Sequence, residues 1–484
     1  MSDGPAPPDP SRDMNEKPDL AAPLSLSPLE PPPLPVPARE PVPASPPPAP
    51  ARDPRAAWPL PLRLLFRFAF LYLVLYNMPF PLGVIPGTEE AALAYGKTVE
   101  AAAGFFGKTV LGFAEAPASF PTGSGDTPIE YCKAALFAAS ALVASAAWSL
   151  AARRSLAHPR LHALLRIHVR YVLAAAMLGY GFAKVFKSQF QMPEGESLFT
   201  PLGQKSPMGL LWSFMGFSTA YTIFVGAAEV LGGTLVLFRR TVTLGALVSA
   251  AVMLNVTLLN FCYDVPVKLY SSHLLAMAVC LALPDLSRLV RFFVANAPVP
   301  PAVLRPFPVP GPRIGRDALT LLKLLCAGYL VVTSGWGGYQ TWKTYGESAP
   351  RGALDGSYSV VTFDRDGQAI PVEPADARRW KRLSLHRRGF AAITTANDAV
   401  EYYSLRVDEE KHEVGLTART RPGADPPEST ETILRFEEPA PNELLLTGDF
   451  DGAPLAVRLK RFSKDDFFLL SRGFHWIQDY PVNR

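Results

Sequence analysis

The chain has 484 residues, of which 49% are hydrophobic and 19% are charged, and its formal net charge at pH 7 is +4. This small charge, without any DNA- or RNA-binding motif near the arginines, excludes nucleic acid as the main partner. The apolar residues are gathered into stretches of about 20 between Trp58 and Trp342, long enough to cross a bilayer as helices. The composition therefore indicates an integral membrane protein in contact with the lipid bilayer.

Residues 1–55 are rich in proline, as in the string PPPLPVPAREPVPASPPPAP. Proline fixes φ and lacks a backbone donor, and the segment has too little apolar surface to offset the entropy of ordering it. We predict a disordered or polyproline II arm in the cytoplasm, either a plain tether or a docking segment for an aromatic-lined partner domain. Because this end is polar, we expect an uncleaved first span rather than a cleavable signal peptide.

Residues 56–345 are predicted to form a polytopic membrane domain. Its spans are expected at about 60–80, 130–152, 168–188, 216–238, 242–262, 270–290 and 318–338. Arginines cluster before the first span and in every second connection after it, and arginine-rich connections face the cytoplasm. The pattern predicts a multi-pass protein of a bacterial plasma (inner) membrane, with a cytoplasmic amino terminus and an extracytoplasmic carboxy-terminal domain.

Residues 88–113 repeat apolar side chains at helical spacing but are interrupted by charge, as in EEAALAYGKTVEAAAGFFGKTV. This pattern predicts an amphipathic helix that lies in the outer interface. The alternative is that the segment spans the membrane. In that case the later helices invert and the arginine pattern becomes wrong.

From about residue 350 the apolar periodicity changes to two, with runs such as YSVVTF, EYYSLRV and LAVRLKRF between turn signals. About eight short strands at spacings of about 8–12 residues predict an all-β small barrel or lipocalin-like domain over 350–484. Its interior either holds a ligand or is filled by its own side chains. In the final segment RGFHWIQDYPVNR, Phe474 and Trp476 are predicted to close the barrel, with contact to a partner as the alternative.

Ionisable residues inside the spans mark the candidate site, because a charge at bilayer depth costs at least about 2.5–3.5 kcal/mol on insertion scales. Tyr180 and Lys184 share one helix face, and Lys184 lies in the outer half of the membrane, where function and snorkelling are both open. Glu229 lies about 15 Å from the arginine end of its span, near the midplane. It is predicted to be protonated and hydrogen-bonded, or paired with a cation such as Lys184. Lys187, one turn further out, is predicted to snorkel.

A second group of polar residues lies toward the outer leaflet. Asp264, before Pro266, is predicted to cap the next helix, with catalysis or anion binding beside Lys268 as alternatives. His273 is interpreted as a hydrogen-bonded packing residue. The loops SGDTPIEY and FTPLGQKSPMGLLWSFMG are expected to fold over an outward-facing polar pocket. The predicted lining of that pocket is Tyr180, Lys184, Glu229, Asn255, Asn260, Asp264 and Lys268.

The stretch from about 165 to 293 resembles the DoxX family of bacterial membrane proteins through YGFAKVFKSQF, SPMGLLWSFMG, YTIFVGAAEVLGGTLVLFRR and LNFCYDVPVKLYSSHLL. It is similar to a long form with an additional first span and a carboxy-terminal β domain. The resemblance implies a four-helix membrane core, with Tyr180, Lys184 and Glu229 as its polar centre, and a redox partner, since the family is named after a subunit of a thiosulfate:quinone oxidoreductase. The four cysteines form no CxxC, and neither a Rossmann fingerprint, a haem-spaced histidine pair nor a metal site is evident.

These observations predict an accessory subunit of a membrane redox system, whose pocket holds a quinone or a small sulfur oxyanion. Lys184 would supply charge, Tyr180 a hydrogen bond and Glu229 a proton, so these three are the catalytic candidates. A quinone is the one cofactor that the resemblance suggests, and electron transfer would require it or a partner subunit. The alternatives are a small-anion or proton transporter and a non-catalytic membrane anchor or assembly factor.

Overall fold

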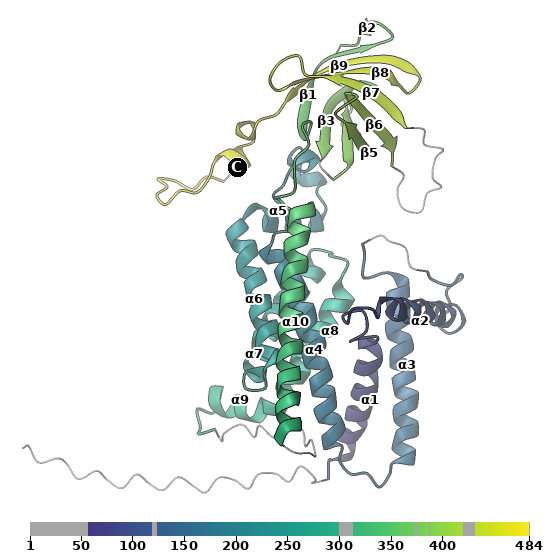
Figure 1. Ribbon diagram of the computed structural model, residues 1–484, viewed down its shortest axis with the longest axis vertical. Helices are drawn as coiled ribbons and strands as arrows, with labels where there is room; N and C mark the ends of the chain where they lie inside the picture. The colour runs from purple at the N-terminus through teal and green to yellow at the C-terminus, as the bar shows by residue number, and fades with distance from the viewer. Residues whose placement is uncertain are drawn as a thin grey trace, which may run out of the picture. The chain divides into compact units, whose positions relative to one another are not determined.

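A computed structural model describes residues 57–118, 123–299 and 313–483, apart from 372, 374, 375, 387 and 420–430. The predicted proline-rich arm lies outside these residues. Within them, a helical part extends to Tyr345 and a β-rich part begins at Gly356 (Figure 1). In the order of elements, helices are therefore followed by strands.

Seven helical stretches are long and apolar enough to cross a membrane, which confirms the predicted spans. The sixth stretch is interrupted by a short 3-10 turn, η3 (Leu283–Asp285), between α8 and α9. The spans are α1 (Leu60–Asn77), α3 (Pro128–Ala151), α4 (Pro159–Val185), α6 (Thr219–Leu237), α7 (Val242–Cys262), α8 (Lys268–Ala282) with α9 (Leu286–Phe293), and α10 (Arg313–Tyr345).

Helix α2 (Glu89–Thr109) is not among these spans, and it lies crosswise to α3 in Figure 1. Its Ala103 packs in a small apolar cluster with Ile129 and Cys132 of α3. The arrangement agrees with the predicted interfacial helix and does not favour an additional span.

A further helix, α5 (Pro207–Phe217), occupies a segment predicted as an outer loop, so that prediction is wrong. The Ser206 hydroxyl accepts from the Gly209 amide, and proline occupies the first turn of this helix. A serine cap followed by proline is a strong start signal. Ser218 caps α6 in the same way, by accepting from the Tyr221 amide. The predicted fourth span therefore begins three residues later than expected.

Helix α4 is the centre of the membrane domain, since it contacts α1, α6, α8 and α10. Val169, Leu173 and Met177 are buried at helical spacing in the largest apolar cluster of this part. The core of α4, α6, α7 and α8 corresponds to the predicted four-helix core. Lys184 lies at the carboxy-terminal end of the same buried stripe.

The β part is a closed antiparallel barrel in which β1 pairs with both β3 and β9. Eight strands make the barrel, and the two-residue β2 pairs antiparallel with the end of β1. The strands are β1 (Gly356–Arg365), β2 (Gln368–Ala369), β3 (Trp380–His386), β4 (Phe390–Thr395), β5 (Val400–Asp408), β6 (Glu413–Ala418), β7 (Thr432–Glu437), β8 (Glu443–Phe450) and β9 (Ala453–Arg461). Phe363, Leu383, Ile393, Leu434 and Val457 are buried in one apolar cluster, so the interior is filled by its own side chains.

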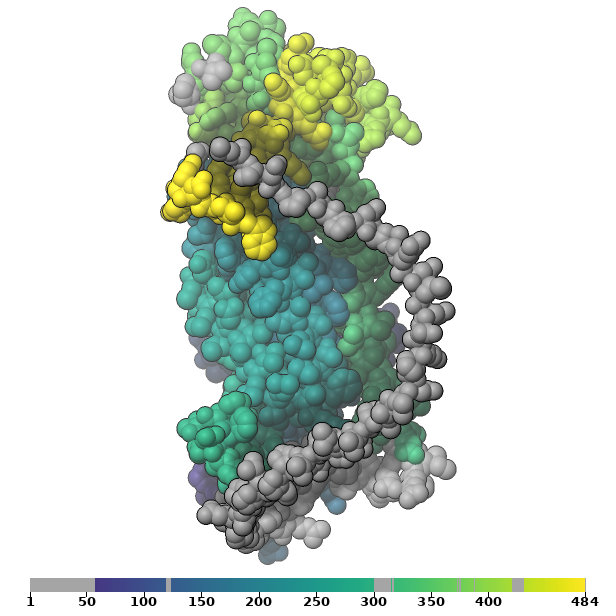
Figure 2. Space-filling view, turned by 90° about the vertical axis from the view of Figure 1, so that its left-hand side faces the viewer, coloured from purple at the N-terminus to yellow at the C-terminus, as the bar shows by residue number. Residues whose placement is uncertain are grey.

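After β9 the chain continues through η4 (Lys464–Asp466) and α11 (Phe468–Ser471) into an irregular tail. The prediction that Phe474 and Trp476 close the barrel is wrong, because they are 77% and 91% exposed. Closure is achieved instead by hydrogen bonding between β1 and β9. Figure 2 shows the carboxy-terminal segment, in yellow, on the surface.

Candidate functional site

A buried ion pair joins α4 and α6. The Lys184 ammonium donates to Glu229 Oε2 at 2.9 Å, and the two residues are only 5% and 2% exposed. Of the two states predicted for Glu229, the structure therefore shows the pair with a cation, and the burial of Lys184 excludes its snorkelling. The same ammonium lies 5.5 Å from the ring centre of Tyr180 and 5.9 Å from that of Phe190, where aromatic faces attract a cation.

Two glycines allow α4 and α6 to approach beside this pair. A Cβ added to Gly181 of α4 would lie 2.9 Å from the Gly226 carbonyl oxygen and 2.7 Å from a Val230 methyl. A Cβ added to Gly226 of α6 would lie 2.7 Å from Lys184 Cβ. Small residues at helix crossings permit such contact in membranes. The glycines therefore set the helix separation that the ion pair requires.

Tyr180 connects the buried pair to the outside of the bundle. Its side chain is 41% exposed at bilayer depth, and its ring lies 6.2 Å from that of Tyr270 on α8. Gly179, the residue before it, has open space where a side chain would be. Tyr180 is therefore accessible at the surface of the bundle, next to this open space.

Lys187 is buried, at 3% exposure, so its predicted snorkelling is wrong. Its ammonium lies 2.7 Å from Glu347 Oε1 and donates to the Gly216 carbonyl and the Thr219 hydroxyl, both at 3.0 Å. Glu347 lies just after α10, Gly216 lies at the end of α5, and Thr219 is the first residue of α6. Lys187 therefore ties together the ends of four helices, α4, α5, α6 and α10, as a structural residue.

The start of α8 is capped by Asp126 and not by Asp264, which corrects the sequence prediction. The Asp126 carboxylate accepts from the backbone amides of Lys268 and Leu269, at 2.8 and 3.0 Å. Asp264 instead pairs with the Lys268 ammonium at 2.8 Å, and its side chain is 81% exposed. The sequence signal for Asp126 is hidden because the residue lies 142 positions before the amide that it caps.

The variant Asp126→Ala is expected to lower the free energy of unfolding by about 1 kcal/mol, because two amides of α8 lose their acceptor. The measurement is an SDS titration of the protein in mixed micelles. Asp264→Asn is the matched control, because it removes an exposed ion pair and keeps a residue type that tolerates the positive φ of this position, and it should change stability by less than about 1 kcal/mol. A larger loss for Asp264→Asn would mean that the cap is misassigned.

The remaining predicted residues do not join the ion pair. Asn260 donates to the Ser271 hydroxyl at 3.0 Å and connects α7 to α8, while Asn255 is exposed. His273 is a hydrogen-bonded packing residue as predicted, 2.6 Å from the Tyr72 hydroxyl. No hydrogen bond or ion pair links these residues or the Asp264 and Lys268 pair to Lys184 or Glu229 in the described part of the chain. The structure thus assembles Tyr180, Lys184 and Glu229 out of the larger predicted set.

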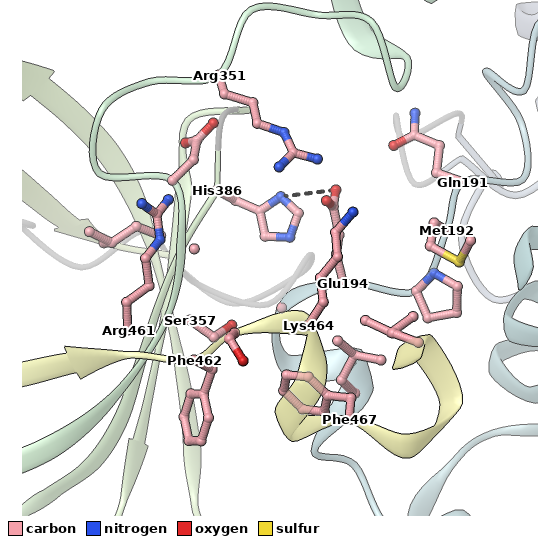
Figure 3. Close-up of a pocket in the computed structure, with 18 of the residues that line it drawn as sticks. Gln191, Met192, Glu194, Arg351, Ser357, His386, Arg461, Phe462, Lys464 and Phe467 are labelled. Atoms are coloured by element: carbon pink, nitrogen blue, oxygen red, sulfur yellow. Dashed lines mark ion pairs between the residues drawn. The ribbon is translucent and has the colours of Figure 1, made fainter. Parts of the chain in front are cut away.

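A cavity of about 750 Å³, here called the junction cavity, lies between the residues that follow α4 and α10 and one end of the barrel (Figure 3). None of the sequence-predicted site residues lines it. Its charged lining residues are Glu194, Glu347, Arg351, Asp355, His386, Arg461 and Lys464. Sequence reasoning missed it because these residues come from separate segments that only the fold brings together.

Glu196, in the 3-10 turn η1 (Gly195–Leu198), holds the barrel to the membrane domain beside this cavity. Its carboxylate pairs with Arg382 at 3.0 Å and accepts from the Thr394 hydroxyl at 3.0 Å. The Arg382 guanidinium lies 4.5 Å from the ring centre of Phe199, which also packs against Phe462 at 4.9 Å. Charged and aromatic contacts together hold the junction.

The apolar helices, the barrel and the buried pair define the class: a multi-pass membrane protein with a closed β-barrel domain. Among the described residues, no group of three or more His, Cys, Asp or Glu side chains could hold a metal ion. The chain is 32% identical to the uncharacterized protein YwoB of Bacillus subtilis (strain 168) over 126 residues, which are 26% of this chain and 79% of that protein. The chain therefore belongs to the family of YwoB. No family model and no solved structure matches the chain.

Proposed function

We propose that this protein is a DoxX-like accessory subunit of a membrane redox system, which binds a quinone headgroup from within the bilayer. The observation that carries the proposal is the Lys184 and Glu229 pair, buried at 2.9 Å beside the partly exposed Tyr180. A quinone carries carbonyl oxygens that accept hydrogen bonds, and the Tyr180 hydroxyl and the Lys184 ammonium are donors. Tyr180, which is 41% exposed, would be the first contact of an apolar molecule that arrives from the side, and the buried Lys184 lies behind it.

The charge balance favours a quinone over a sulfur oxyanion. Lys184, Lys187 and Lys268 each have a carboxylate partner within 2.9 Å. An anionic ligand in the spans would have to compete with these partners, whereas a neutral ligand would not. The same pairing gives little support to a small-anion transporter.

In this proposal each residue of the site has its own task. Tyr180 and Lys184 donate hydrogen bonds to the quinone oxygen. Glu229 holds the ammonium in place and takes a proton from the bound quinone or gives one to it. Electron transfer to or from the quinone is the task of a redox partner subunit.

Tyr180→Phe is expected to lower the quinone retained by purified protein about five- to tenfold, because one donor to the headgroup is lost. The measurement is mass spectrometry of small molecules extracted after gentle detergent purification. Tyr221→Phe removes the hydroxyl of a 40% exposed tyrosine of α6 and should leave retention unchanged. Wild-type protein that neither retains quinone nor is stabilised by added quinone would refute the proposal.

We further propose a bacterial plasma membrane location with the amino terminus in the cytoplasm and the barrel outside. Support comes from the arginines at the opposite end of the spans from the barrel. Buried Arg170 donates to the Val236 and Leu237 carbonyls at 2.8 and 2.5 Å, and Arg67 donates to the Ala152 carbonyl at 3.2 Å. These contacts satisfy carbonyls that helix ends leave without partners.

One observation favours a second function, a membrane anchor or assembly factor. The tail exposes a run of large apolar side chains that the barrel does not cover. They are Phe474, Trp476, Ile477 and Tyr480, at 77%, 91%, 86% and 70% exposure. Such residues are enriched where proteins contact partners. If no quinone binds, this function is the one that remains.

A further inference from the structure

Three cations line the junction cavity without an ion pair to any described residue: Arg351, Arg461 and Lys464. Among the residues drawn in Figure 3, the only ion pair marked joins His386 to Glu194. Arg461 lies 5.8 Å from the ring centre of Tyr358, which leaves its hydrogen-bond donors available. Burial raises the pKa of Tyr358, and its neutral hydroxyl donates to the Leu354 carbonyl.

The acids of the cavity, in contrast, are engaged. Glu194 lies 3.7 Å from His386, and Glu347 pairs with the buried Lys187 at 2.7 Å. Asp355 accepts from the Gly352 amide at 3.0 Å. Counting Lys187 with the lining gives four lysines and arginines against three carboxylates, with His386 as a further titratable base. The cavity therefore contains cationic side chains that its own carboxylates do not pair with.

The cavity lies beside the residues that follow two of the candidate spans, α4 and α10. Glu347 follows the last residue of α10 by two positions, a chain distance of at most about 7 Å. Gln191 donates to the Tyr345 carbonyl at 2.8 Å, and the Met192 amide donates to Glu347 at 3.2 Å. These contacts join the ends of α4 and α10 into one wall of the cavity. A lipid headgroup at the outer surface is within reach of it.

Two glycines position the basic side chains. A Cβ on Gly356 would lie 2.7 Å from Arg461 Nε, and a Cβ on Gly195 would lie 2.9 Å from His386 Nε2. Glycine at these places lets a guanidinium and an imidazole lie directly against the backbone. The cavity is thus built from residues that are held in place.

We propose that the junction cavity binds the phosphate group of a membrane lipid headgroup. Arginine forks match phosphate oxygens and lysine adds a point charge. The volume of about 750 Å³ exceeds what a phosphate fills, and Met192, Leu198, Phe462, Phe467 and Leu470 supply apolar lining for the rest of an amphiphile. This inference is independent of quinone binding, because it concerns a separate site outside the spans.

The test uses the full chain in maltoside micelles, titrated calorimetrically with dihexanoyl phosphatidylglycerol, with inorganic phosphate and with dihexanoylglycerol, which lacks phosphate. The triple variant Arg351→Gln, Arg461→Gln and Lys464→Gln should weaken binding of the phospholipid at least about tenfold. Lys381→Gln, Arg406→Gln and Lys411→Gln remove the same charge from barrel residues that already have acid partners. This control triple should bind as the wild type does.

The three ligands distinguish the sources of phosphate. Tight binding of the phospholipid alone supports the headgroup, whereas equal affinity for inorganic phosphate supports the phosphate site and assigns it to a soluble ligand. Equal affinity for dihexanoylglycerol, or an equal loss in both triple variants, overturns the proposal. If the triple variant does not fold, the single variant Lys464→Gln, at an exposed position, is titrated with the same three ligands and compared with the wild type.

Discussion

Replacing Lys184 with methionine is expected to lower the free energy of unfolding by about 3–5 kcal/mol, since Glu229 is then buried without its cation. Both side chains are nearly inaccessible, so neither water nor another described ion pair replaces the lost contact. The measurement is an SDS titration in mixed micelles, followed by circular dichroism. The loss should appear at low ionic strength and persist in salt, because a buried pair is weakly screened.

The double variant Lys184→Met and Glu229→Leu should recover most of that stability, because it removes both charges and leaves apolar side chains. Lys381→Met, which breaks an exposed pair with Asp398 at 2.6 Å, should cost less than about 1 kcal/mol. If Lys184→Met behaves like Lys381→Met, the buried pair does not contribute as the structure indicates. Loss of quinone by the stable double variant would separate binding from folding.

Replacing Gly226 with alanine is expected to lower the free energy of unfolding by about 1–3 kcal/mol, because overpacking forces the two helices apart. The added Cβ would lie 2.7 Å from the Gly181 carbonyl oxygen and 2.8 Å from the Val185 amide nitrogen. Backbone atoms cannot rotate away as the end of a side chain can. The same displacement would separate Lys184 from Glu229, so quinone retention should fall with stability.

Gly179→Ala is the matched control on α4, because an added Cβ there has no neighbour within 4 Å. Alanine is the better helix former by about 1 kcal/mol, so this variant should be unchanged or slightly more stable. The comparison is made by the same titration. Equal losses in both variants would show that the helix crossing does not depend on Gly226.

The sequence alone determined the seven spans and the change to strands near residue 350, and it reduced Glu229 to two states, a protonated carboxyl or a partner of a cation. Span length and strand alternation are local properties, so they can be read along the chain. That restriction follows from the cost of an isolated charge in hydrocarbon. The side of α4 that carries Lys184 was likewise set by helical periodicity.

Only the tertiary structure decided the partners that come from distant segments. Asp126 reaches α8 across 142 positions, and Lys187 meets Glu347 beyond the last span. The sequence indicated Asp264, close to α8 in the chain, as the cap of that helix, and it indicated snorkelling for Lys187. Both predictions were wrong. Whether the barrel interior is filled, and where a cavity is left, depends on the packing of side chains from several strands. These are properties of the folded chain, because the atoms concerned become neighbours only when helices and strands assemble.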